Sequence, residues 1–183
     1  HIEGSIHSFL QKFGYNEIRT PMFENSQLFN RSIGEDTDIV TKEMYSWVDQ
    51  GNNHLTLKPE ATASVVRAFI QHNLGRKSNL NRFYYIDSFF RRERPQKGRY
   101  RQFKQFGIEA IGSKYPEQDV EIISAAYNFY ISMGIKDIIL KINSIGSNDI
   151  RNNYKENLSK YLKPFINKLS KTSQDRLKTN PLR

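Results

Sequence analysis

The chain has 183 residues, a length that fits one domain with a hydrophobic core better than two domains. Because it contains no cysteine, disulfide bonds, thiolate zinc sites and cysteine nucleophiles are excluded together. No apolar run approaches the roughly 18 residues of a membrane span, and the N-terminal segment does not resemble a signal peptide. A soluble, cytoplasmic protein with no membrane partner is therefore expected.

The formal net charge of +9 is concentrated in two zones. Residues 91–101 carry six basic side chains and one acidic one, and residues 151–183 carry nine basic and two acidic ones. The rest of the chain is left with a net charge of −3. Two basic zones on a mildly acidic chain indicate sites for anions, although the second zone could also be the solvated face of a helix.

The first half of the chain is predicted to mix helices with short strands. Apolar residues at helical spacing predict a helix over residues 2–13, which Gly14 would end. Residues 16–20 are predicted to form a strand that stops at Pro21, because proline cannot donate to a sheet. Three further elements follow, namely a short helix from Asn25 or Ser26 through Phe29, a hairpin of residues 43–49 and 54–58 around Gly51-Asn52-Asn53, and a helix after Thr62.

The second half contains the strongest strand signals. Residues 82–90 and 102–112 are aromatic runs on either side of the basic loop, and they predict two antiparallel strands. Three more elements are predicted, namely a helix over residues 117–133, a short strand over 137–142 and a helix from Asp149 until Pro164. Since the strands cluster in hairpins, the expected fold class is α+β, an antiparallel β-sheet flanked by helices.

A group of charged and aromatic side chains surrounds the basic loop. Arg91 and Glu93 lie two residues apart at the end of one predicted strand, and Arg99, Arg101 and Phe103 alternate as they enter the other. A hairpin would place the two sets across from each other. Guanidinium groups bind phosphates, a ring stacks on a base, and a carboxylate accepts from an amine. The pattern predicts a nucleotide triphosphate site; a basic surface loop with Phe103 in the core is the alternative.

The sequence around this loop resembles motif 2 of class II aminoacyl-tRNA synthetases, and FRRERPQKGRYRQFKQFGIEAIG at 90–112 is similar to the histidyl-tRNA synthetase family in particular. Further matches follow the same order along the family, namely residues 13–24 and 28–45 with its motif 1 region, LTLKPEATASVVRA at 55–68 with its amino-acid-binding segment, and NSIGS at 143–147 and TNPLR at 179–183 with its later landmarks. The chain departs from the family at Lys58, Ala61 and Lys104, where Arg, Gly and His are common.

The resemblance implies a role for each matching side chain. Binding of ATP would fall to Arg91, Glu93, Arg99, Arg101 and Phe103, and Arg91 would also be catalytic, because it would hold the α-phosphate and the histidine carboxylate. Histidine would be bound by Glu60, Thr62, Arg91, Gln105 and Glu109, with Glu109 on the imidazole. No protein metal site is expected, since Mg²⁺ would lie on the ATP phosphates. Without the resemblance, Glu60 could be a charge at a helix N-terminus and Glu109 an exposed strand residue.

The activity that the resemblance implies is that of a histidine–tRNA ligase, with histidine, ATP and tRNA(His) as ligands and a homodimer formed through the motif 1 region. Residues 1–150 would be a catalytic core carrying motifs 1 and 2, and residues 151–183 a basic helical segment leading into an inserted domain. Motif 3 and the anticodon-binding domain would follow, so the chain alone is expected to be inactive or weakly active. One alternative is a non-catalytic relative, either the regulatory subunit of ATP phosphoribosyltransferase or the synthetase-like domain of a stress kinase. The other is a plain RNA-binding module. The complete set of matching side chains favours the enzyme over the first, and the acids at 60, 93 and 109 beside the arginines favour it over the second.

Overall fold

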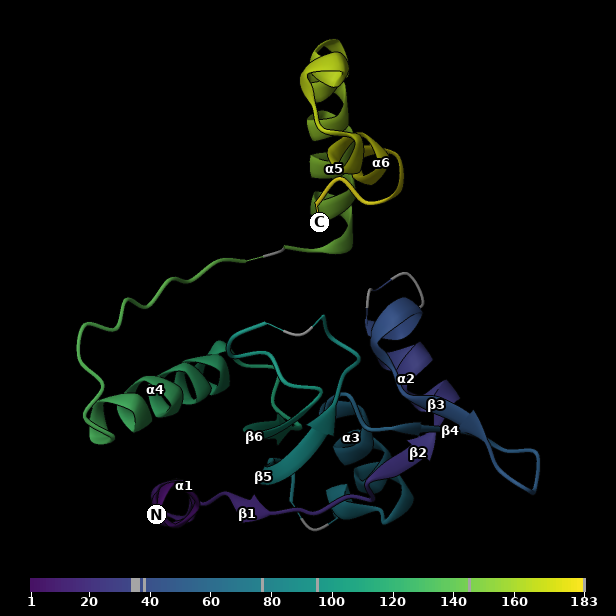
Figure 1. The fold of residues 1–183 in the computed structure, drawn as a ribbon. Coiled ribbons are helices and arrows are strands. Elements are labelled where there is room, and N and C mark those ends of the chain that lie inside the picture. Colours follow the sequence, from purple (N-terminus) through teal and green to yellow (C-terminus); the bar gives the residue numbers. More distant parts are fainter. Residues whose placement is uncertain (34–36, 38, 77, 95, 145, 183) are drawn as a thin grey trace. The chain divides into compact units, whose positions relative to one another are not determined.

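The structure is a computed structural model that describes residues 1–33, 37, 39–76, 78–94, 96–144 and 146–182 (Figure 1). The chain forms two compact units, His1–Ile138 and Ile139–Arg183. The division falls before the domain boundary expected at residue 150, so residues 139–150 group with the second unit. None of the described helices is long and apolar enough to cross a membrane.

The centre of the first unit is a three-stranded sheet of order β1-β5-β6. The strands β5 (Asn81–Phe90) and β6 (Gln102–Ile111) are antiparallel and stay in register from Asn81 opposite Ile111 to Phe90 opposite Gln102. Both predicted aromatic strands are therefore confirmed. The first strand, β1 (Asn16–Glu17), pairs in parallel with β5 and is shorter than the predicted run of 16–20.

Helices cover both faces of this sheet, because alternate residues of β5 and β6 are apolar toward each side. On one face, Tyr84 of β5 packs with Ile6 and Leu10 of α1 (Ile2–Lys12) and with Phe129 of α4 (Pro116–Ser132). On the other face, Tyr85 and Phe89 pack against Ala61 and Val65, at the start of α3 (Thr62–Gln71) (Figure 1). The three predicted helices are confirmed.

A second small sheet has the order β2-β4-β3, formed by β2 (Phe23–Asn25), β4 (His54–Leu57) and β3 (Ser46–Val48). The predicted hairpin is confirmed, and its turn requires a left-handed backbone at Asn52, with φ of 61°. Among the described residues between β2 and β3 are the helix α2 (Ser26–Ile33) and a π-helical turn η1 (Ile39–Glu43). The sequence predicted a helix only through Phe29, and it did not predict the π turn.

The second unit is helical, with α5 (Asn148–Leu162), the 3-10 turn η3 (Lys163–Lys168) and α6 (Lys171–Thr179). A further 3-10 turn, η2 (Leu74–Arg76), follows α3 in the first unit. Ser147 caps α5 by accepting from the Ile150 amide, and the predicted interruption at Pro164 is confirmed because η3 replaces α5 from Lys163 onward. The turn expected over residues 143–147, before α5, stays a prediction, because Ile145 lies outside the described residues.

The predicted strand at residues 137–142 is wrong. Asp137 has a left-handed backbone, with φ of 62°, which cannot continue a strand. Among the residues that the structure describes, no strand pairs with this segment, and Ile139 and Ile142 are 79% and 73% exposed. An apolar run becomes a strand only when a neighbouring backbone completes its hydrogen bonds, and the periodicity of the sequence does not contain that information.

Candidate active site

The register of β5 and β6 brings the predicted site residues of β6 to one face of the sheet. Phe103, Gln105 and Glu109 are separated by even numbers of residues, so their side chains share a face. Their partners on β5 are Phe89, Asp87 and Phe83, respectively. This is the face that α3 covers, since Phe89, Phe83 and Phe103 belong to the cluster that contains Ala61 and Val65. The sheet thus aligns an aromatic ring, an amide and a carboxylate in one row.

Glu109 meets the start of α3 through Thr62. The Thr62 hydroxyl donates to Glu109 Oε1 at 2.6 Å. Glu60 lies beside this pair, and its carboxylate accepts from the backbone amides of Thr62, at 2.6 Å, and Ala63, at 3.0 Å. The interpretation of Glu60 as a helix N-terminal charge is therefore confirmed, and the same contacts hold its carboxylate next to Glu109. Three of the residues predicted to bind histidine thus form one cluster.

The cluster contains a tyrosine that the sequence analysis missed. Tyr85 is buried opposite Gly107 in the register. A Cβ atom on Gly107 would lie 2.2 Å from the Tyr85 hydroxyl, so the glycine makes room for the ring. A glycine directly across from an aromatic residue in two antiparallel strands is the signal that could have revealed this packing.

Burial and like charge shift the proton affinities of this cluster. Burial raises the pKa of Glu109 above its usual value, and the neighbouring Glu60 acts in the same direction, while the hydrogen bond from Thr62 opposes them. Burial raises the pKa of Tyr85 to about 12, with smaller contributions from Glu109 and Glu60. Two carboxylates and a phenol of raised pKa in a half-buried cluster suit a ligand that brings its own positive or proton-donating groups.

Arg91 follows the end of β5 and lies beside the aromatic end of the same face. Its Nε donates to the Pro59 carbonyl at 2.9 Å, and its backbone amide donates to the Arg101 carbonyl at 3.0 Å. The centre of the Arg91 guanidinium is 5.4 Å from the centroid of the Phe103 ring, and that ring is 6.1 Å from the ring of Phe89. The structure therefore brings Arg91 and Phe103 together.

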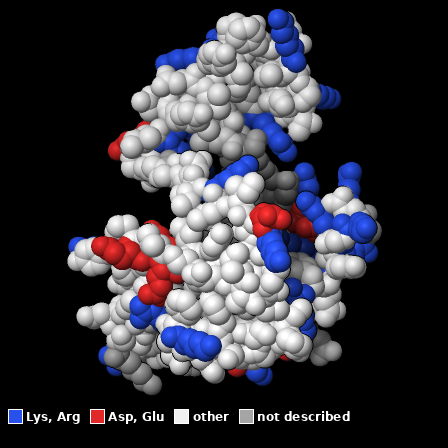
Figure 2. Space-filling model, turned by 90° about the vertical axis from the view of Figure 1, so that its left-hand side faces the viewer, with Lys and Arg blue, Asp and Glu red and all other residues white. Residues whose placement is uncertain are grey.

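A cavity of about 670 Å³ lies next to Arg91, beyond the strand ends. It is lined by Lys42, Glu43, Arg92, Glu93, Arg94, Gln96, Arg99 and Arg101. Arg99 and Glu93 form an ion pair at 2.8 Å within it. On the face of the molecule drawn in Figure 2, Asp and Glu side chains lie beside Lys and Arg side chains. Guanidinium groups of this number suit a ligand with several phosphates.

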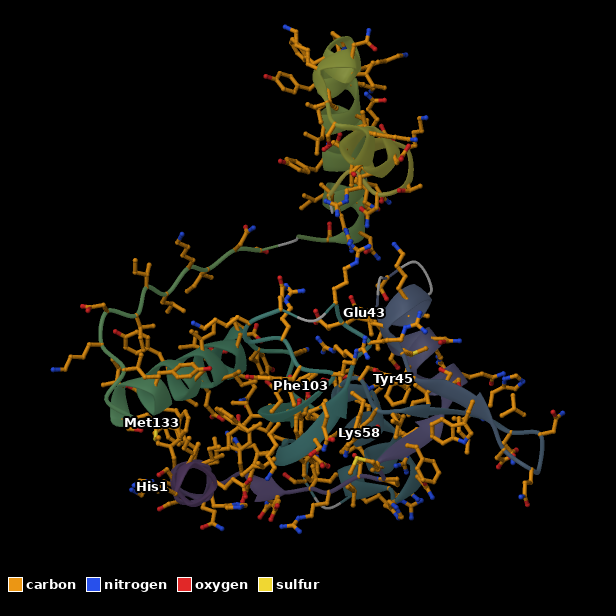
Figure 3. The ribbon with its side chains drawn as sticks, in the orientation of Figure 1. His1, Glu43, Tyr45, Lys58, Phe103 and Met133 are labelled. Atoms are coloured by element: carbon orange, nitrogen blue, oxygen red, sulfur yellow. The ribbon has the colours of Figure 1, made fainter. Side chains whose placement is uncertain are left out.

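Lys42 and Glu43 of the cavity come from the π turn η1 and were not predicted as site residues. The Arg92 amide donates to the Glu43 carbonyl at 2.7 Å, which ties the turn to the basic loop. Figure 3 labels Glu43 and Phe103, which come from η1 and β6. π turns are frequent at functional sites, but they arise from tertiary packing and leave no reliable pattern in a sequence. Among the described residues, no group of three or more His, Cys, Asp or Glu side chains could hold a metal ion.

The central antiparallel hairpin with helices on its two faces is the α+β core fold of class II aminoacyl-tRNA synthetases. The family model described as "Histidyl-tRNA synthetase" matches residues 1–150. The chain belongs to the histidyl-tRNA synthetase family.

Curated relatives and solved structures agree with this membership. The chain is 48% identical to histidine–tRNA ligases of Protochlamydia amoebophila and Caldicellulosiruptor saccharolyticus, over 100% of its own length but only 43% and 44% of theirs. Apo histidyl-tRNA synthetase of S. aureus superposes with a TM-score of 0.74 at 38% identity, over 98% of this chain and 42% of that one. An ATP phosphoribosyltransferase regulatory subunit/histidyl-tRNA synthetase from Bacillus halodurans shares the fold, with a TM-score of 0.69 at 21% identity. The chain spans less than half the length of these curated relatives.

Proposed function

We propose that the protein to which this chain belongs is a histidine–tRNA ligase that activates histidine with ATP and transfers it to tRNA(His) in the cytoplasm. The observation that carries the proposal is a single sheet face with Phe103 at one end, where Arg91 lies over its ring, and Glu109 at the other, where Thr62 and Glu60 meet it from the start of α3. An amino acid bound along this face would direct its carboxylate toward the arginine. Its side chain would reach the acidic cluster.

In the first step, the histidine carboxylate attacks the α-phosphorus of ATP and pyrophosphate leaves. Arg91 would neutralise the charge that develops on the α-phosphate, and Arg99 and Arg101 would bind the departing phosphates in the basic cavity. Mg²⁺ on the phosphates would add further positive charge there. Phe103 would stack on adenine and Glu93 would accept from its amine. No protein nucleophile is required, because alignment and charge neutralisation lower the barrier.

In the second step, a terminal ribose hydroxyl of the tRNA attacks the activated carbonyl, and AMP leaves. Selection of histidine would precede this step. Glu60, Thr62 and Gln105 would receive the α-amino group, and Glu109 would accept from the imidazole. An apolar amino acid would offer the half-buried Glu109 no hydrogen bond beyond the one that Thr62 already donates, and sites with such polar matching reject analogues by about 10⁴–10⁵.

The second sheet supports assembly as a homodimer through the motif 1 region. On one of its faces, the hydroxyl of Thr56 is hydrogen-bonded to the hydroxyls of Ser26 and Ser46. The other face carries the exposed rings of Phe23 and Trp47, whose centroids are 5.7 Å apart. Exposed aromatic side chains of this kind are enriched at protein interfaces, and a second copy of the chain would cover them.

The experiment that tests the ligase is ATP–pyrophosphate exchange by the full-length protein with each amino acid in turn. Exchange that depends on histidine, with the other amino acids at background, is the expected result. A regulatory subunit of ATP phosphoribosyltransferase, as the Bacillus halodurans neighbour is named in part, would show no exchange with any amino acid. Absence of histidine-dependent exchange would reject the proposed function.

A further inference from the structure

A fully buried lysine lies beneath the proposed site and none of the roles above uses it. The Lys58 side chain is 0% exposed, and its Nζ is ion-paired with the Asp87 carboxylate. The same Nζ donates to the Thr20 carbonyl at 3.2 Å and lies 5.6 Å from the centroid of the Phe89 ring. Figure 3 labels Lys58 in the first unit. Removing a charge from water is costly unless the charge is paired, so the buried Lys58 ammonium depends on the Asp87 carboxylate.

Lys58 is also held through its backbone. Its amide donates to the Met22 carbonyl and its carbonyl accepts from the Phe90 amide, both at 3.0 Å. The next carbonyl, that of Pro59, accepts from Arg91 Nε. Lys58 therefore fixes the segment that connects β4 to α3 against the end of β5. The two residues that follow Lys58 are Pro59, whose carbonyl orients Arg91, and Glu60, which lies beside Glu109.

Asp87 anchors the other side of the pair on the site face. It lies opposite Gln105 in the register of β5 and β6. One of its oxygens accepts from the Ser88 amide at 2.8 Å, and the other binds Lys58. The carboxylate is thus held by its own strand and reaches across to the Lys58 segment. A buried ion pair adds little stability compared with apolar residues of the same volume, but it fixes the geometry of two elements.

We infer that Lys58 and Asp87 are positioning residues, which hold the Pro59 carbonyl so that it orients the Arg91 guanidinium for histidine activation. The inference rests on the proposed ligase function. Neither residue would touch ATP or histidine; both would act through Arg91. Loss of the pair should reduce turnover more than nucleotide binding, because Glu93 and Phe103 would contact the adenine without the help of Pro59.

The test uses Lys58→Met and Asp87→Asn in the full-length enzyme, with histidine-dependent ATP–pyrophosphate exchange as the assay. For both variants we expect kcat to fall by about tenfold or more while KM for ATP stays within about threefold of wild type, because small misplacements of a catalytic group cost this much. Lys58→Arg, which keeps the cation, should recover kcat to within about threefold of wild type. Asp87→Asn preserves shape, so it carries the test if Lys58→Met does not fold.

Lys104→Met is the matched control, since Lys104 is also ion-paired, with Glu3, and its side chain lies on the opposite face of β6. It should leave kcat and KM unchanged. The inference is overturned if folded Lys58→Met and Asp87→Asn keep wild-type kcat, if Lys104→Met loses as much, or if Lys58→Arg is no better than Lys58→Met. Wild-type enzyme without histidine-dependent exchange would instead reject the proposed function.

Discussion

Arg91 carries more of the proposed chemistry than any other side chain, and its surroundings hold it in one orientation. The Pro59 carbonyl fixes Nε and the Phe103 ring lies alongside the guanidinium. An arginine held in this way needs little rearrangement when charge develops on a phosphate, and such preorganised donors are worth far more than mobile ones. Its environment, rather than its exposure, distinguishes it from the other arginines of the basic loop.

Replacing Arg91 with alanine in the full-length enzyme should reduce kcat for histidine-dependent ATP–pyrophosphate exchange by about 10²–10³, the usual loss of one preorganised donor. Steady-state exchange kinetics measure the effect. Arg19→Ala is the control, because Arg19 is exposed and its ion pair is with the nearby Glu17. Exchange by Arg91→Ala within a few-fold of wild type would contradict the assignment.

At the acidic end of the site, Glu109→Gln should raise KM for histidine strongly. The amide keeps the shape of the carboxylate but loses its charge, and charge-assisted hydrogen bonds are about twice as strong as neutral ones. We expect kcat/KM for histidine to fall by about 10²-fold or more, while KM for ATP changes little. The measurement is exchange at varied histidine. An unchanged KM for histidine would remove Glu109 from the imidazole site.

Helix α4 is attached to the central sheet by a compact polar network around Glu121. Its carboxylate accepts from Arg82 Nε at 2.9 Å and Nη2 at 2.8 Å, from the Tyr15 hydroxyl at 3.0 Å and from Gln118 at 2.9 Å. The hydrogen bond from Arg82 makes the largest contribution to lowering the pKa of Glu121 from 4.5 to about 2. The network joins α4, β5 and the segment before β1.

Because the pKa of Glu121 is lower in the folded state, the network stabilises the fold above pH 4.5 and loses that contribution as pH falls from about 4.5 to about 2. Glu121→Gln should lower the free energy of unfolding at pH 7 by about 1–3 kcal/mol, as expected for a broken charged hydrogen-bond set. It should also flatten the acid limb of the stability curve. Thermal unfolding from pH 2 to 7 checks this, with the exposed Glu117→Gln as control.

The close contact between Gly107 of β6 and Tyr85 of β5 leads to a prediction about stability. Gly107→Ala places a Cβ 2.2 Å from the Tyr85 hydroxyl, so the ring must move, and overpacking of this kind costs about 1–3 kcal/mol. Gly4→Ala in α1 is the matched control, since no atom lies within 4 Å of its added Cβ, and alanine favours a helix by about 1 kcal/mol. In chemical denaturation, the free energy of unfolding should fall for Gly107→Ala and rise for Gly4→Ala. Equal stability of the two variants would contradict the packing at Tyr85.

At the scale of the whole molecule, sequence patterns predicted the elements whose signal is local. The aromatic alternation of β5 and β6 and the helical spacing of α1, α3 and α4 all gave the correct element. Residues 137–142 did not form the predicted strand, since pairing depends on a distant backbone. The row of Phe103, Gln105 and Glu109 follows from strand period. The packing of Tyr85 against Gly107 could have been inferred once the strand register was known. Glu43 and the Lys58–Asp87 pair could not be predicted, because they depend on contacts between elements far apart in sequence.

The proposed homodimer makes a prediction for the assembled enzyme. Trp47→Ser in the full-length protein should weaken self-association by removing an aromatic side chain from the interface, and losses of about 2 kcal/mol or more are typical of central aromatic residues. Sedimentation at varied concentration measures the dissociation constant. Tyr100→Ser is a control for an exposed aromatic residue of the basic loop. Identical dissociation constants for Trp47→Ser and wild type would place the contact elsewhere.

The ion pair between Arg99 and Glu93 has a consequence for which anions can enter the basic cavity. Free pyrophosphate would bind Arg99 and break its ion pair with Glu93, whose side chain is largely buried. The Glu93 carboxylate would then lose this counter-ion and would lie next to a polyanion, which is strongly unfavourable. An adenine nucleotide would bring a phosphate for the guanidinium and an exocyclic amine for the carboxylate, so both former partners would be satisfied again. Without a nucleotide, the protein would therefore bind other cellular phosphates weakly, because a ligand must supply a partner for Glu93 as well as for Arg99.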